Sequence, residues 1–164
     1  MGVSGSGKTT IGTLLARRSG SVFADADDYH SAANKLKMAL GHPLNDIDRL
    51  PWLTILNKLL IGWFRTGQNG ILACSALKEA YRDRLSQGMP TGTLHFVLLE
   101  ASRELIAERI AVRGHEFMNP NLLESQLETL EPPRDAFTIT NNRSPEIVAG
   151  AIIAHIDLCS MLDR

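Results

Sequence analysis

The segment Gly2–Thr9 constrains the fold of this 164-residue chain more than any other feature. It fits the pattern G-x-x-x-x-G-K-[ST] at every fixed position. In that pattern, backbone N–H groups wrap a phosphate, the lysine reaches the β- and γ-phosphates, and the hydroxyl ligates Mg²⁺. Apolar residues at helical spacing follow at once, so a helix over 8–19 should add its N-terminal dipole to the anion site. We expect a nucleoside triphosphate to be held by Gly2, Val3, Ser4, Gly5, Ser6, Gly7, Lys8, Thr9 and Thr10.

Helical and strand-like segments alternate along the rest of the chain. Strands are expected over 21–24, 71–75, 93–100 and 137–140. Further helices are expected over 31–40, from 46 or 51 to 64, and over 77–85, 102–113, 120–131 and 145–159. This alternation predicts an α/β fold with a parallel sheet. Because no repeat, low-complexity tract or linker interrupts the pattern, residues 1–164 are expected to form a single domain.

The first strand of the expected fold has no counterpart in the sequence. A phosphate-binding loop connects a strand to a helix, yet only Met1 precedes Gly2. Either Met1 is an internal methionine of a longer product or the protein lacks a central strand. The first alternative is favoured, since losing a central strand would expose hydrogen-bonding groups on both of its neighbours.

The composition is that of an ordinary globular domain, with 44% hydrophobic and 21% charged residues. Seventeen Lys and Arg residues against 18 Asp and Glu residues leave a net charge of −1, which disfavours binding to nucleic acid or an anionic membrane. Cys74 and Cys159 lie in apolar stretches without C-x-x-C spacing, which favours two buried, reduced thiols. No signal peptide and no apolar run of 18 residues are visible, so the cytoplasm is the expected compartment.

Two carboxylates follow the expected strand over 21–24. In open α/β sheets the functional site lies at the carboxyl ends of the strands, which places Asp25 and Asp27 beside the phosphate-binding loop. We expect Asp25, with Thr9, to hold the magnesium ion. Asp27 is expected to accept the proton of a substrate hydroxyl during phosphoryl transfer to it, a reaction in which Lys8 would stabilise the transferred charge.

Cationic side chains in the middle of the chain point to an acidic substrate. Lys78 and Arg82 are four residues apart, so on a helix they would face the same direction. With Arg49 and His30 they could form a pocket for a carboxylate, because an arginine suits bidentate contact with that group.

Six segments together resemble the gluconokinase family of small P-loop sugar-acid kinases. They are residues 1–8, 25–30 (D-x-D-x-x-H), 43–52 (P-L-N-D-x-D-R-x-P-W), 74–83 (C-S-A-L-K-x-x-Y-R-D), 114–118 (G-H-x-F-M) and 126–132 (Q-L-E-T-L-E-P). The longer segments are far more specific than the phosphate-binding loop alone, and the resemblance runs in order from the first residue to about residue 133.

The resemblance implies ATP- and Mg²⁺-dependent phosphorylation of D-gluconate to 6-phospho-D-gluconate, feeding the pentose phosphate pathway. It also implies a three-layer nucleoside-kinase-like fold with strand order 2-3-1-4-5, a helical lid over about 109–121, and a homodimer. Arg109 and Arg113, at i and i+4, would grip the ATP phosphates as the lid closes. His115 and Gln126 fall in the matching segments and are expected to contact the substrate.

Other functions fit parts of the same pattern. A shikimate- or nucleoside-type kinase would share the frame, although the cations near Lys78 disfavour a neutral nucleoside. A GTPase is disfavoured because the sequence has no N-K-x-D segment. A nucleotide-binding module without catalytic activity would follow if the first strand were truly lost.

Overall fold

The computed structural model describes residues 1–113, 120–134 and 136–162, without the side chains of 112, 113, 120–122 and 158–162. The strands are β1 (Val22–Asp25), β2 (Gly70–Ala73), β3 (Val97–Glu100) and β4 (Phe137–Thr140). The helices are α1 (Lys8–Ser19), α2 (Ala32–Ala39), α3 (Asp46–Arg65), α4 (Glu79–Ser86), α5 (Arg103–Arg113), α6 (Pro120–Thr129) and α7 (Pro145–Leu162). A short 3-10 helix, η1 (Ala26–Tyr29), follows β1.

Local sequence signals account for most of these boundaries. Gly20 ends α1 in a left-handed conformation (φ 66°) and donates its N–H to the Ala16 carbonyl. A reciprocal capping box between Asn45 and Asp48 starts α3. The expected strand over 93–100 is wrong in its first half: Thr93 N–H donates to the Pro90 carbonyl in a turn, and β3 begins only at Val97.

The strands form two parallel pairs, β1 with β2 and β3 with β4. These are the outer pairs of the expected order 2-3-1-4-5. Met1 lies at the position between the pairs: its amino group donates to the Val97 carbonyl, and its own carbonyl accepts from Leu99 N–H at 3.0 Å. Gly2 N–H donates to the Ser75 carbonyl at 3.2 Å. The start of the phosphate-binding loop is thereby fixed against both β3 and the end of β2.

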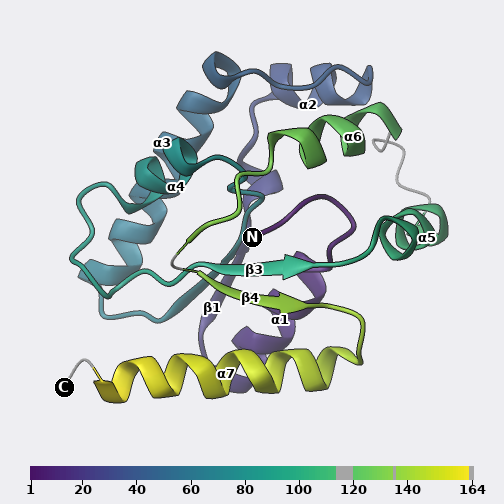
Figure 1. The fold of residues 1–164 in the computed structure, drawn as a ribbon. Coiled ribbons are helices and arrows are strands. Elements are labelled where there is room, and N and C mark those ends of the chain that lie inside the picture. The colour runs from purple at the N-terminus through teal and green to yellow at the C-terminus, as the bar shows by residue number, and fades with distance from the viewer. Residues whose placement is uncertain (114–119, 135, 163–164) are drawn as a thin grey trace.

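Helices cover both faces of the strands, as expected for the three-layer fold (Figure 1). On one face, α1 and α7 pack through an apolar cluster that includes Ile11, Leu15 and Ile152. On the other face, α3 and α4 pack through a larger cluster centred on Trp52 and Leu56. The nucleoside-kinase-like α/β fold is therefore confirmed.

The structure also tests two smaller expectations. Cys74 is a free, buried thiol, and burial raises its pKa to about 11, so it stays protonated and unreactive. The side chain of Cys159 lies outside the described residues. Within the described part of the chain, no helix is long and apolar enough to cross a membrane.

Candidate functional site

The phosphate-binding loop forms a compact turn ahead of α1. Gly7, at the N-cap of α1, has φ 97°, a value that favours glycine. Gly5 has φ 77°, and a Cβ there would lie 2.9 Å from the Ile106 side chain, so the loop also needs glycine for space. Lys8 Nζ donates to the Val3 carbonyl at 3.0 Å across the loop. The conformation matches what the sequence pattern predicts for a phosphate cradle.

Two distant side chains hold this loop. Gln126 on α6 makes two hydrogen bonds to Ser4. Its Oε1 accepts from Ser4 N–H at 2.8 Å, and its Nε2 donates to Ser4 Oγ at 3.1 Å. Asn141, directly after β4, donates from Nδ2 to the Ser6 carbonyl at 2.7 Å. Ser6 is fully buried, and its Oγ has no hydrogen-bond partner among the described residues. The loop is thus fixed by contacts across more than 120 residues of sequence.

Thr9 and Asp25 meet as the sequence predicts. Thr9 Oγ1 donates to Asp25 Oδ2 at 2.7 Å, and Asp25 Oδ1 accepts from Asp27 N–H at 3.1 Å. Hydroxyl and carboxylate oxygens suit Mg²⁺, which commonly takes one or two protein ligands and completes its octahedron with waters and substrate phosphates. The pair therefore fits a magnesium ion bound together with a nucleotide. The described residues contain no cluster of three His, Cys, Asp or Glu side chains that could bind a metal without such help.

Asp27 lies on η1, directly beyond the carboxyl end of β1. Desolvation raises the pKa of Asp27, Lys8 lowers it, and the carboxylates of Asp25 and Asp28 raise it further. Its side chain is nevertheless 86% exposed, so solvent screens these effects and leaves the carboxylate open to an incoming substrate. A carboxylate in this position can accept a proton from a hydroxyl group.

His30 is buried rather than cationic, which corrects the expected pocket. Its ring stacks on Trp52 with centroids 4.4 Å apart, and its Nδ1 has no partner among the described residues. Desolvation, with smaller contributions from Arg49 and Lys35, lowers the pKa of His30 to about 4. Asp27 Oδ1 lies 4.0 Å from Nε2, a contact that would favour protonation, but at that distance it does not offset the burial. His30 is therefore neutral at neutral pH.

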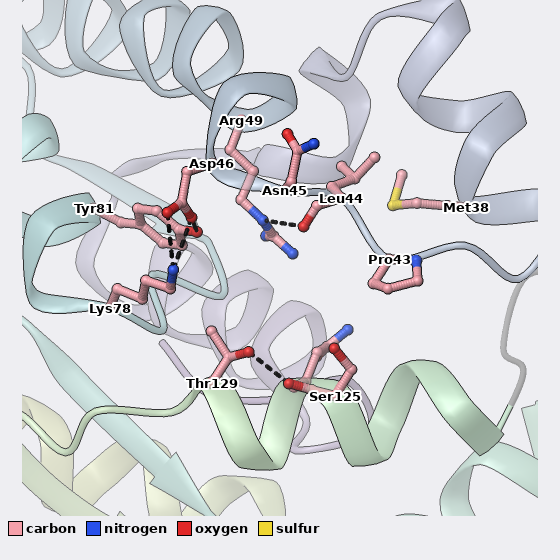
Figure 2. A pocket seen from close by; sticks show the side chains of 11 residues that line it. Met38, Pro43, Leu44, Asn45, Asp46, Arg49, Lys78, Tyr81, Ser125 and Thr129 are labelled. Atoms are coloured by element: carbon pink, nitrogen blue, oxygen red, sulfur yellow. Dashed lines mark hydrogen bonds and ion pairs between the residues drawn. The ribbon is translucent and has the colours of Figure 1, made fainter.

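A cavity of about 220 Å³ opens between α3, α4 and α6 (Figure 2). Its lining is polar and apolar in nearly equal parts and includes both signs of charge, an arrangement that suits a small, hydroxylated acid. Gln126 belongs to this lining and also binds Ser4, so the cavity adjoins the phosphate-binding loop. The lining residues are Met38, Pro43, Leu44, Asn45, Asp46, Arg49, Lys78, Tyr81, Ser125, Gln126 and Thr129.

The cationic groups of the cavity differ in how far they are already engaged. Lys78 Nζ contacts both oxygens of Asp46, at 2.8 and 3.0 Å, and the Tyr81 hydroxyl donates to the same carboxylate. These contacts lower the pKa of Asp46 and raise that of Lys78. Arg49 Nε donates to the Leu44 carbonyl at 3.3 Å, and its guanidinium group extends from α3 into the cavity (Figure 2). Arg49 is the better placed of the two cations to meet a carboxylate.

Arg82 does not line the cavity, which corrects the expectation that Lys78 and Arg82 face the same pocket. Lys78 precedes α4 with extended backbone (φ −93°, ψ 152°), and the helical i, i+4 rule does not apply to it. Arg82 is 7% exposed, and its Nη1 donates to the carbonyls of Ala76 and Leu77, each at 3.1 Å. Ala76 has φ 44°, a strained value for a residue other than glycine. Arg82 therefore supports the loop that leads to Lys78.

Residues 109–121, the expected lid, are only partly described. Arg109 on α5 donates from Nη2 to the Asn141 carbonyl at 2.8 Å, and its buried Nη1 has no partner among the described residues. This guanidinium group lies beside Gly7 of the phosphate-binding loop. The side chain of Arg113 and the whole of His115 fall outside the described residues.

Several residues of the site were not predicted from the sequence. Asn141 and Tyr81 carried no signal by themselves, although Tyr81 lies within a family segment. Asp46 could have been found, because a carboxylate next to Asn45 and two residues before Asp48 offers acceptors for sugar hydroxyls. Its ion pair with Lys78 spans 32 residues and depends on the fold.

Comparison with known proteins agrees with this geometry. A family model described as an AAA domain matches residues 1–133. Gluconokinase of Gluconobacter oxydans (strain 621H) is 40% identical over 159 residues, which cover 94% of this chain and 88% of that protein. The thermosensitive gluconokinase of Escherichia coli (strain K12) is 46% identical over 134 residues, covering 82% of this chain and 71% of that protein. The chain belongs to the gluconokinase family.

Solved structures place the gluconokinase family on the same fold. A gluconokinase from Sinorhizobium meliloti 1021 superposes with a TM-score of 0.86 at 37% identity, covering 99% of this chain and 92% of that one. An unliganded sugar kinase from Janibacter sp. HTCC2649 gives 0.87 at 41% identity, covering 96% and 91%. Shikimate kinase from Aquifex aeolicus is 17% identical with a TM-score of 0.61, a likeness in fold alone.

Proposed function

We propose that this chain is a gluconokinase: it transfers the γ-phosphoryl group of ATP to the C6 hydroxyl of D-gluconate, giving 6-phospho-D-gluconate and ADP. One observation carries the proposal beyond family membership. The cavity around Arg49 meets the phosphate-binding loop at Gln126, which lines the cavity and binds Ser4 of the loop. A nucleotide site and an acid-binding site thus adjoin, as in-line transfer between two substrates requires. The product would feed the pentose phosphate pathway.

The nucleotide side of the site uses the loop residues 2–10 and the start of α1. Their N–H groups and Lys8 would bind the ATP phosphates, while Thr9 and Asp25 would hold Mg²⁺, which supplies charge neutralisation at the phosphates. Arg109 already faces the loop, and its buried Nη1 is available to a phosphate oxygen. We propose the same phosphate-binding role for Arg113. We also propose that residues from 109 to about 121 form the lid.

The acceptor side holds the acid and activates its hydroxyl. Arg49 would bind the gluconate carboxylate, with Lys78 next to it. Asp46, Asn45 and Gln126 offer partners for the sugar hydroxyls. Asp27 would take the proton from the C6 oxygen as that oxygen forms its bond to the γ-phosphorus and the bond to ADP breaks.

We propose further roles for residues around the site. His115 would contact the substrate from the lid, whereas His30 and Arg82 would act indirectly, through the packing around Trp52 and the loop after β2. The acting unit would be a homodimer of single-domain chains in the cytoplasm. Neither a membrane nor a nucleic acid is required by the reaction.

A substrate panel tests the proposal. ADP release would be followed with Mg²⁺ and ATP in the presence of gluconate, shikimate, glycerate or nucleosides. We expect turnover with gluconate well above the rest, and its loss in Asp27→Asn. Turnover of shikimate or a nucleoside at least equal to that of gluconate would reject the assignment. ATP binding without any turnover would point to a nucleotide-binding module.

A further inference from the structure

Asn141 binds three separate parts of the molecule. Its Nδ2 donates to the Ser6 carbonyl at 2.7 Å, and its backbone N–H donates to the Glu100 carbonyl at 2.6 Å. Its own carbonyl accepts from Arg109 Nη2 at 2.8 Å. The residue is 3% exposed. One buried residue thus joins the phosphate-binding loop, the carboxyl end of β3 and helix α5, which Figure 1 shows close to that end of β3.

The side-chain amide lies directly against the loop. A Cβ atom on Gly7 would come 2.3 Å from Asn141 Nδ2, so only glycine fits opposite it. The Ser6 carbonyl and the Gly7 N–H belong to one planar peptide group, and in a trans peptide they point in opposite directions. By holding the carbonyl, Asn141 sets the direction of the Gly7 N–H, a donor at the N-terminus of α1 where a phosphate would bind.

Arg109 is held by the backbone of Asn141 and not by its side chain. Its Nη1 lies 3.8 Å from the position of a Cβ on Gly7, so this guanidinium group faces the same stretch of loop. Substitution of the Asn141 side chain would therefore release the loop peptide while the contact to Arg109 can persist. The two effects are separable by experiment.

We propose that Asn141 is a positioning residue for the nucleotide: its amide fixes the Ser6–Gly7 peptide in the orientation that binds phosphate. The proposal rests on the proposed function for the identity of the ligand. It assigns Asn141 to the nucleotide side alone, because its described contacts reach the loop, β3 and α5, and it is absent from the cavity lining. Nucleotide affinity and sugar-acid affinity should therefore respond differently to its substitution.

The test compares Asn141→Ala with Asn142→Ala, since Asn142 is the exposed neighbour. Calorimetric titration with MgADP should give a Kd raised about tenfold in Asn141→Ala, the loss of one buried hydrogen bond, and an unchanged Kd in Asn142→Ala. KM for ATP should rise in parallel, with KM for gluconate within about twofold of wild type. Asn141→Ser, which keeps a hydroxyl donor, should lie between wild type and Asn141→Ala.

Three other outcomes of these measurements decide whether Asn141 has this positioning role. A folded Asn141→Ala protein with the wild-type Kd for MgADP, or with both KM values raised equally, would overturn the proposal. Failure of both Asn141 variants to fold would also overturn it, in favour of a purely structural role. If the wild type binds MgADP but does not phosphorylate gluconate, the proposed function fails while the Kd comparison still tests Asn141.

Discussion

Replacement of His30 by phenylalanine should remove a defined part of the pH dependence of stability. In the folded chain the pKa of His30 is lowered from 6.5 to about 4, mainly by desolvation. As the pH falls through 6.5, the unfolded chain therefore takes up a proton that the folded chain does not. The free energy of unfolding falls between pH 6.5 and 4, and this loss is absent well above pH 6.5. Phenylalanine can stack on Trp52 in the same way but does not titrate.

The magnitude follows from the linkage relation. At pH 5, a shift from 6.5 to about 4 corresponds to a loss of about 2 kcal/mol relative to pH 8. The Asp27 carboxylate, 4.0 Å from the ring and exposed, contributes about 1 kcal/mol in the opposite direction and reduces the expected loss to about 1 kcal/mol. The direction follows from charge, because the negative Asp27 carboxylate favours the protonated ring.

The assay is urea unfolding at pH 5 and pH 8. The wild type should lose about 1 kcal/mol more than His30→Phe between the two pH values. His42→Phe, a change at an exposed histidine, controls for the removal of any histidine. If wild type and His30→Phe lose equal stability, His30 is not buried in its neutral form and the correction to the cationic pocket is mistaken.

Three further predictions address the roles proposed for the site. Asp27→Asn should lower kcat by about 100-fold or more while ATP affinity is retained. Asp28 is the exposed neighbour, and Asp28→Asn should leave kcat unchanged. Equal losses of kcat in both variants would show that another residue is the base. Arg49→Ala should raise KM for gluconate by roughly 30- to 150-fold, equivalent to about 2–3 kcal/mol for a charge-assisted contact. KM for ATP should change little, and the α3 surface variant Lys58→Ala should leave both KM values unchanged. Equal effects of Arg49→Ala on both substrates would make Arg49 structural. Arg82→Leu should lower the free energy of unfolding by about 2 kcal/mol, because two buried carbonyls lose a charged donor; unchanged stability in urea would contradict a supporting role.

The sequence predicted the parts of this molecule that depend on neighbours in the chain. Helix α1 begins and ends where the loop pattern and Gly20 place it, and the contact between Thr9 and Asp25 follows from strand and loop geometry common to α/β sheets. The parallel pairing of the strands also agrees with the expected order. In each case a short-range pattern or a general rule of chain topology decides the structure.

Prediction was wrong where burial decides the state of a side chain. A histidine in D-x-D-x-x-H looks like a cation in the sequence, but the burial of its ring lowers the pKa to about 4 and makes the neutral form the stable one. Arg82 looks like a partner of Lys78 only if both are helical, and Lys78 is not. Burial and backbone state arise from packing between elements far apart in sequence, so spacing alone does not reveal them.

The geometry of the phosphate-binding loop is itself a property of the whole fold. Gln126 fixes Ser4 from α6 and Asn141 fixes Ser6 from the end of β4, over separations of 122 and 135 residues. Gln126 also lines the cavity proposed for the sugar acid. A ligand that shifts α6 on entering the cavity must therefore move Ser4 or break two hydrogen bonds to it. Because any such energetic link is reciprocal, a nucleotide that fixes the loop would favour the α6 position that binds the acid.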